Sequence, residues 1–96
     1  MILYHGSRPE RRAAILRDGL TPRARTDPGY VNPCGVFLAT TVVEARYFGQ
    51  DIWAVNTDGL TLHVDPDSYN ENGEDDNYYV TDAIEPSRVR LTGNLD

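Results

Sequence analysis

The sequence predicts an α+β domain, in which short strands recur along the chain and two helices lie in its first half. Short apolar runs bounded by turn residues indicate the strands, and the helix-start pattern Ser/Thr-x-x-Glu precedes apolar segments at Ser7–Glu10 and Thr41–Glu44. The chain has 96 residues, of which 40% are hydrophobic and 25% are charged. This composition is typical of one globular domain, covering residues 1–96.

The first strand is expected at residues 2–4 and leads into a His-Gly-Ser turn, where Gly6 lacks a Cβ and lets a ligand approach the backbone. Ser7 is expected to cap a helix that runs to about Asp18, with Gly19 as a left-handed C-cap and Leu20 folded back onto the helix. The helix residues expected to be buried are Ala13, Ile15 and Leu16, and those expected to face outward are Arg11 and Arg12.

Residues 21–34 carry no apolar period and are expected to form a functional or mobile loop. A strand over 35–40 then leads into a helix that Thr41 caps and Gly49 ends. Strands over 52–55 and 60–64 are expected to form a hairpin around residues 57–59, with His63 facing solvent. The last strands are expected over 78–81 and 89–91.

The segment 65–76 is acidic and rich in Asn and Gly, which first suggests a calcium-binding loop. An EF-hand needs flanking helices, a glycine at its sixth position and a glutamate at its twelfth, and this segment has none of them. We therefore interpret it as a flexible hairpin loop, and the sequence predicts no metal site.

The net charge of −6 is distributed unevenly along the chain. Residues 1–50 carry seven arginines and four acidic residues, a charge of +3, whereas residues 51–96 carry two arginines and eleven acidic residues, a charge of −9. An acidic chain disfavours extensive nucleic-acid binding, but a small anionic ligand could bind the first half. Cys34 is the only cysteine, and no apolar run approaches the roughly 18 residues of a membrane span, so we expect a cytoplasmic protein without a membrane anchor.

Three segments share a recognisable spacing: Leu3–Arg8 reads LYHGSR, Ala14–Leu20 reads AILRDGL, and Gly35–Ala39 reads GVFLA ahead of ARYF at Ala45–Phe48. Together they resemble the catalytic domain of poly(ADP-ribose) polymerases and related ADP-ribosyltransferases, the diphtheria-toxin-like class with a His-Tyr-Glu motif. The resemblance implies a minimal ADP-ribosyltransferase-like fold of two small packed, mostly antiparallel sheets and two short helices, with NAD as co-substrate.

The resemblance also implies how NAD is held. His5 and Ser7 would bind a ribose, and the backbone of Gly6 would pair with the nicotinamide carboxamide. Phe37 stands where the family has the tyrosine that packs on nicotinamide, and Phe48 stands where an aromatic side chain stacks on its other face.

Further positions follow from the same resemblance. Tyr47 is the neighbouring choice for the stacking aromatic, and Ala45 falls on a small polar position that helps to hold the carboxamide. Arg8, Arg23 or Arg25 would be available for the pyrophosphate, because guanidinium groups are planar donors suited to it.

The third motif of the family is a glutamate that opens a Glu-Tyr-x-Val strand, and here Asn77 takes its place. An amide accepts a hydrogen bond but cannot act as a base, so the resemblance implies transfer of a single ADP-ribose unit to a macromolecular acceptor and no polymer. Asn77 is expected to line an open cleft beside the nicotinamide ribose. Asn77→Glu should therefore raise activity by about 10²–10⁴ at little cost in stability.

Two other functions remain open. One is a binding module that keeps the fold, has lost catalysis, and engages a basic partner protein through its acidic second half; the acidic residues concerned are Glu71, Glu74, Asp75 and Asp76. The other is an RNA 2′-phosphotransferase of the same superfamily, which requires several arginines around the histidine, and the sequence alone does not place them there.

Overall fold

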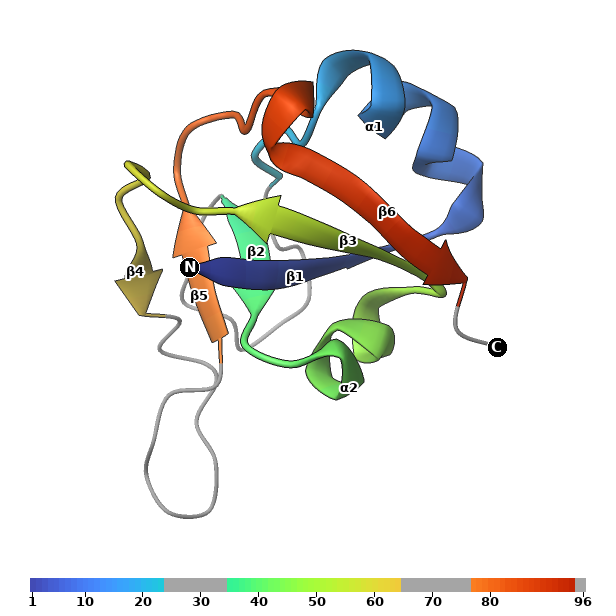
Figure 1. Ribbon diagram of the computed structural model, residues 1–96, viewed down its shortest axis with the longest axis horizontal. Coiled ribbons are helices and arrows are strands. Elements are labelled where there is room, and N and C mark those ends of the chain that lie inside the picture. Colours follow the sequence, from blue (N-terminus) through green and yellow to red (C-terminus); the bar gives the residue numbers. More distant parts are fainter. Residues whose placement is uncertain (24–34, 65–76, 95–96) are drawn as a thin grey trace.

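The strands of the structure belong to one antiparallel sheet, drawn in Figure 1. The computed structural model describes residues 1–23, 35–64 and 77–94. Its strands are β1 (Ile2–Ser7), β2 (Val36–Ala39), β3 (Asp51–Asn56), β4 (His63–Val64), β5 (Asn77–Val80) and β6 (Val89–Asn94). They are hydrogen-bonded in the order β4-β5-β2-β1-β3-β6. The predicted α+β class is confirmed.

The sheet has two halves that are joined at a single register pair. β1 pairs with β3 at six positions but with β2 only at Tyr4–Ala39. In Figure 1, β2 and β5 run at a steep angle to β1, β3 and β6. The expected division into two separate sheets is not confirmed, because hydrogen bonds connect the β4–β5–β2 half with the β1–β3–β6 half.

Short helical segments connect the strands. They are the 3₁₀ turn η1 (Pro9–Arg11), the helix α1 (Arg12–Asp18), the helix α2 (Val42–Ala45), and the 3₁₀ turns η2 (Arg46–Phe48) and η3 (Pro86–Arg88). The predicted cap of the second helix is confirmed, because the Thr41 hydroxyl accepts a hydrogen bond from the Glu44 amide at 3.2 Å. The predicted cap of the first is wrong: Ser7 belongs to β1, and Arg8 precedes η1 without a side-chain cap.

Apolar side chains cover both faces of the sheet. The larger cluster contains Leu3, Ile15, Leu20, Val36, Leu38, Trp53, Val55, Val80 and Ile84. The smaller one contains Ala39, Ala45 and Ile52. α1 thus contributes to one cluster and α2 to the other, and Figure 1 shows these helices above and below β1 and β3.

The predicted buried face of α1 is only partly correct. Ile15 is buried, but Leu16 is 60% exposed and Ala13 is also exposed. Arg12 keeps 42% of its side chain exposed, but it also forms two hydrogen bonds with the fully buried Asp51, at 2.8 and 2.7 Å, which the sequence did not predict. The start of α1 is therefore held on the sheet by an ion pair, whereas the sequence predicted that a wider apolar face of the helix would hold it.

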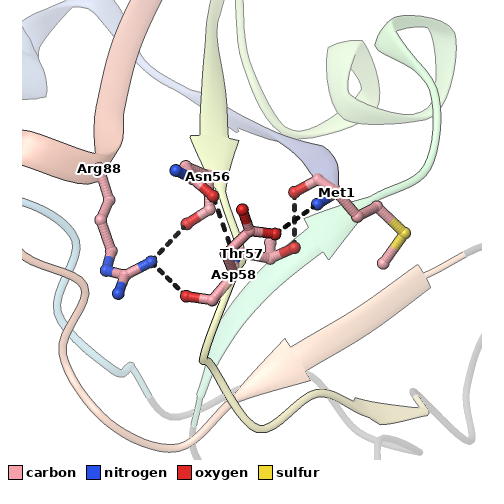
Figure 2. A network of polar contacts seen from close by, with 5 residues as sticks. All are labelled: Met1, Asn56, Thr57, Asp58 and Arg88. Atoms are coloured by element: carbon pink, nitrogen blue, oxygen red, sulfur yellow. Dashed lines mark hydrogen bonds and ion pairs between the residues drawn. The ribbon is translucent and has the colours of Figure 1, made fainter.

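The predicted hairpin between β3 and β4 is wrong, because both edges of β3 are already paired with β1 and β6. The turn itself exists: the Leu60 amide donates to the Thr57 carbonyl at 2.9 Å, and Gly59 has a φ of 81°. Figure 2 shows what holds it, an ion pair of 2.8 Å from the Met1 amine to Asp58 and hydrogen bonds from Arg88 to nearby carbonyls.

After the turn the chain crosses to the far edge of the sheet, where β4 pairs with β5. His63 was expected to face solvent, and this prediction is wrong. Its side chain is half-buried and stacks on Tyr79, with 5.0 Å between the ring centroids. Among the helices of the described segments, none is both long and apolar enough to cross a membrane.

Candidate functional site

A cavity of about 240 Å³ lies where β1 and β2 diverge. Beyond the Tyr4–Ala39 pair, the two backbones no longer pair, and the His5 side chain bridges the gap, with Nδ1 2.9 Å from the Phe37 carbonyl oxygen. Residues from both halves of the sheet therefore line one hollow. A split between neighbouring strands exposes backbone groups that a ligand can use.

The cavity gathers six of the nine residues that the sequence assigned to the site, namely His5, Gly6, Ser7, Arg8, Phe37 and Phe48. The other three, Ala45, Tyr47 and Asn77, do not line it. The roles that the resemblance implies for all nine stay predictions, but most of the predicted site converges in space.

His5 is held as a neutral imidazole with a defined tautomer. A carbonyl can only accept, so Nδ1 carries the proton and donates it to Phe37, which leaves Nε2 as an acceptor. Burial lowers the pKa of His5 below its ordinary 6.5; the hydrogen bond with Phe37 opposes this shift, and the positive charge of Arg11 adds to it. At neutral pH the ring can therefore accept a hydrogen bond from a ligand hydroxyl.

Ser7 has the complementary polarity. Its hydroxyl oxygen accepts a hydrogen bond of 2.9 Å from the indole nitrogen of the buried Trp53. Because one lone pair is used in this way, the hydroxyl proton remains available for donation. His5 and Ser7 thus offer an acceptor and a donor on the same strand, which suits a ligand that carries both hydroxyl and carbonyl groups.

Gly6 is a glycine for a reason that the sequence did not reveal. A Cβ at Gly6 would collide with the carbonyl oxygen of Ala45, and a Cβ at Gly49 would collide with the backbone of Ser7. The end of α2 and η2 therefore packs directly against β1, backbone to backbone. Ala45 is fully buried in this contact. Gly6 does line the cavity, but its missing side chain makes room for α2.

This contact brings Phe48 to the cavity that Phe37 of β2 also lines. Phe48 is 48% exposed, and Phe37 is half-buried with its ring 6.0 Å from that of Tyr79. Tyr47 points elsewhere: it is 79% exposed and lines a separate surface depression with Val43 and Arg46. Of the two aromatic candidates on η2, only Phe48 lies at the cavity.

Asn77 begins β5 as predicted, and its register places it opposite Ala39. By strand alternation it shares a sheet face with Tyr79 and Phe37. The expectation that it lines an open cleft is wrong, because it is only 7% exposed. Its Oδ1 atom has no hydrogen-bond partner among the described residues. The position is a tight one, and an unsatisfied acceptor there costs stability.

Comparison with known proteins adds no further assignment. No protein-family model and no curated protein matches this chain.

Three arginines line the cavity: Arg8 and Arg23, which were expected near a pyrophosphate, and Arg11, which was expected to face outward. Arg8 precedes η1 and Arg11 ends it, and Arg23 follows Leu20 and Thr21, which also line the cavity. A spacing of three residues between Arg8 and Arg11, within one turn, is the signal that could have revealed their common side. Arg25, the third candidate for the pyrophosphate, lies outside the described residues.

The acid–base chemistry of the cavity is limited. None of the described residues that line it is an aspartate or a glutamate. Within the described segments there is also no group of three His, Cys, Asp or Glu side chains that could hold a metal ion. These lining residues can orient a ligand by hydrogen bonds, stack on it with aromatic rings and attract it by positive charge.

Proposed function

We propose that this chain binds NAD in the cavity between β1 and β2 and transfers one ADP-ribose unit to a macromolecular acceptor. The observation that carries the proposal is the convergence of His5, Gly6, Ser7, Phe37 and Phe48 on one cavity between the diverging strands. The ADP-ribosyltransferase-like fold, with two packed sheets, is part of the proposal. The steep angle between the two halves of the sheet supports it.

Each contact in the proposal uses a group with the right polarity. The lone pair of His5 Nε2 accepts from a ribose hydroxyl, and the Ser7 hydroxyl donates to an oxygen of the ligand. Phe37 and Phe48 provide apolar surface for the nicotinamide ring. The enclosed volume of about 240 Å³ is below the usual range for a whole ligand of this size, about 300–1,000 Å³, so the cavity holds one half of the dinucleotide.

The reaction breaks the bond between nicotinamide and C1′ of the ribose. Nicotinamide leaves with the bonding electron pair, the sugar passes through an oxocarbenium-like state, and the nucleophile of the acceptor forms the new bond to C1′. The proton of the acceptor goes to solvent or to the acceptor itself, because no carboxylate is present among the described lining residues. Orientation of the dinucleotide therefore provides most of the rate.

Labelled NAD tests the proposal. Wild type, His5→Ala and Arg17→Gln should be incubated with NAD labelled in its adenylate part, with and without a cell lysate as the source of acceptors. We expect label on protein with wild type and Arg17→Gln, and a loss of at least tenfold with His5→Ala. Arg17 is a matched control because it pairs with Asp18 at the exposed end of α1. Absence of transfer with folded wild type contradicts the proposal.

The alternative function is a module that keeps this fold without catalysis and binds a basic partner protein. Two observations favour it: Ala45 and Asn77 are buried, and neither lines the cavity. The acidic residues of that interpretation, 71 and 74–76, lie outside the described residues. Calorimetry separates the two functions, since binding of NAD that His5→Ala abolishes supports the enzyme, and no heat on addition of NAD supports the module.

A further inference from the structure

The three arginines at the cavity differ from Arg12, Arg17 and Arg88 in forming no ion pair within the described part of the chain. Arg12, Arg17 and Arg88 form ion pairs with Asp51, Asp18 and Glu85. No ion pair or side-chain hydrogen bond joins Arg8, Arg11 or Arg23 to any other described residue. Their positive charge is therefore not neutralised by the part of the chain that the structure describes.

The backbone holds these three residues in place. The Arg11 amide donates to the Arg8 carbonyl at 3.0 Å, which fixes the turn that carries both. Arg23 and Gly35 exchange two backbone hydrogen bonds, at 2.9 and 3.0 Å. The adjacent pair of Arg12 with Asp51 anchors the start of α1. The three side chains thus start from hydrogen-bonded backbone, so little backbone ordering is needed when they bind a ligand.

Arg11 and Arg23 are close enough to influence each other. Burial lowers the pKa of the Arg11 guanidinium, and the positive charge of Arg23 lowers it further. Arginine nevertheless remains protonated in proteins, so the two like charges repel without relief from proton loss. A bound anion would relieve this repulsion, and guanidinium groups match the geometry of phosphate oxygens.

We propose that Arg8, Arg11 and Arg23 form a phosphate subsite, so that the ligand of this cavity carries a phosphate group beside the part that meets His5 and Phe37. The subsite rests on the proposed function where NAD supplies the phosphate, as its pyrophosphate, but a phosphate monoester offers the same chemistry. It predicts that charge, rather than the nicotinamide ring, determines most of the affinity. ADP-ribose should then bind nearly as well as NAD, and nicotinamide alone should bind weakly.

Calorimetric titrations at low and at physiological salt test the subsite. The ligands are inorganic pyrophosphate, AMP, ADP-ribose and nicotinamide, and the proteins are wild type, Arg11→Gln, Arg23→Gln and Arg17→Gln. We expect pyrophosphate to bind wild type with an affinity that falls as salt rises. Each change at Arg11 or Arg23 should raise the Kd about tenfold, since a hydrogen bond with a charged group contributes about that factor. Arg17→Gln should bind like wild type.

Two further measurements keep the test decisive. Arg11→Lys retains the charge and loses the planar fork, so its Kd should lie between those of wild type and Arg11→Gln. Urea denaturation of each variant checks folding. ADP-ribose binding more tightly than AMP assigns the subsite to a pyrophosphate, and the reverse order assigns it to a monoester; both support a phosphate subsite.

The inference and the proposed function fail in different ways. If NAD binds and His5→Ala abolishes the binding, but Arg11→Gln and Arg23→Gln do not change it, the subsite is refuted and the proposed function survives. If pyrophosphate binds with the predicted arginine dependence, but wild type transfers no label from NAD, the subsite stands and the proposed function is refuted. Equal binding of pyrophosphate by wild type and by both glutamine variants overturns the subsite.

Discussion

At the scale of single residues, His5 connects two strands whose backbones have parted. Its Nδ1 atom replaces a ladder hydrogen bond by donating to the Phe37 carbonyl, and its Nε2 atom remains for a ligand. The structural role requires a neutral ring or a doubly protonated one, but the ligand role requires the lone pair of Nε2. Burial and Arg11, which both lower the pKa of His5, preserve that lone pair at neutral pH.

The lowered pKa of His5 predicts how stability depends on pH. In the unfolded chain, the imidazole takes up a proton as the pH falls through about 6.5, whereas the folded ring resists protonation to lower pH. The free energy of unfolding of wild type should therefore fall as the pH drops from 7 to 5. His5→Asn keeps a donor for the Phe37 carbonyl and does not titrate, so its slope should be smaller.

Urea denaturation at several pH values measures both slopes. His63→Asn serves as the control, because His63 lies on the other half of the sheet, at its β4 edge. If wild type and His5→Asn show the same slope between pH 7 and pH 5, His5 is not the group responsible.

Asn77 predicts a conflict between activity and stability. Its side chain is nearly buried and its Oδ1 atom lacks a described partner, so a glutamate would place a larger, ionisable group in the same space. We expect Asn77→Glu to lower the free energy of unfolding by about 1–3 kcal/mol, in contrast to the small cost expected from the sequence. Asn77→Leu removes the unsatisfied acceptor at similar volume and should be nearly neutral.

Chemical denaturation of the two Asn77 variants at pH 7 decides this point, and NAD hydrolysis by the same samples tests for a gain in rate. An Asn77→Glu protein as stable as wild type would mean that the carboxylate reaches solvent or a partner. The position would then resemble the open cleft expected from the sequence.

At the scale of elements, two glycines determine how α2 meets the sheet. Gly6→Ala would drive a methyl group into the carbonyl oxygen of Ala45, a backbone atom that no side-chain change can move. We expect a loss of about 1–3 kcal/mol in stability and weaker ligand binding, because Phe48 would be displaced with η2. Gly35→Ala is the matched control. Its Cβ meets mainly the Tyr79 side chain, at 3.0 Å, and a side chain can yield, so the loss should be smaller.

Thermal melting of Gly6→Ala and Gly35→Ala, together with titration of pyrophosphate, measures both effects. If Gly6→Ala melts like Gly35→Ala, the close packing of α2 on β1 is not what requires glycine at this position.

The anchor of α1 predicts a second pH effect, at lower pH. Hydrogen bonds from Arg12 lower the pKa of the Asp51 carboxyl, burial opposes the shift, and the charge of Arg12 adds to it. A carboxylate with a lowered pKa stabilises the fold above its unfolded pKa of about 4, and this contribution is lost as the pH falls through the folded value. Arg12→Ala leaves the buried Asp51 unpaired and should destabilise the protein clearly more than Arg17→Ala, whose partner Asp18 is exposed.

Unfolding at pH 7 and at pH 3 measures this difference. The gap between Arg12→Ala and wild type should narrow at pH 3, because the unfolded Asp51 carboxyl takes up a proton there and wild type loses part of the stability that the pair contributes. A gap that is the same at both pH values would show that Arg12 stabilises the protein through packing of its aliphatic stem.

At the scale of the whole molecule, the cavity lies on the seam between the two halves of the sheet. His5 belongs to one half and Phe37 to the other, and the backbones on either side of the cavity pair only at Tyr4–Ala39. A ligand that touches both halves stabilises the folded state in proportion to its affinity. At about 100 times its Kd, NAD or ADP-ribose should raise the free energy of unfolding by about 3 kcal/mol.

Urea denaturation with and without ligand measures this gain, and an unchanged midpoint at such a concentration would mean that the ligand does not prefer the folded chain. Arg11→Gln should reduce the gain at a fixed ligand concentration, because its Kd is expected to be higher. The change in the free energy of unfolding thus tests both ligand binding between the two halves of the sheet and the phosphate subsite.

Local features could be predicted from the sequence because they depend on neighbours within a few residues. The Thr41 cap is one example, and the positive φ of Gly19, 78°, is another. Strands near both ends of the chain also follow from short segments. The grouping of His5, Gly6, Ser7, Phe37 and Phe48 at one cavity was instead implied by the resemblance, which spans three separate segments.

The tertiary structure alone decided which strands are neighbours and which polar groups meet. β4 pairs with β5 because both edges of β3 are occupied. Ser7 does not cap a helix, because it lies in β1, where its hydroxyl oxygen accepts a hydrogen bond from Trp53. Arg12 turns inward to Asp51, which lies 39 residues further along the chain, and Asn77 is buried by a register that its own segment does not encode. Such contacts form between distant segments, and their energies depend on burial and pairing in the assembled fold, which local sequence does not contain.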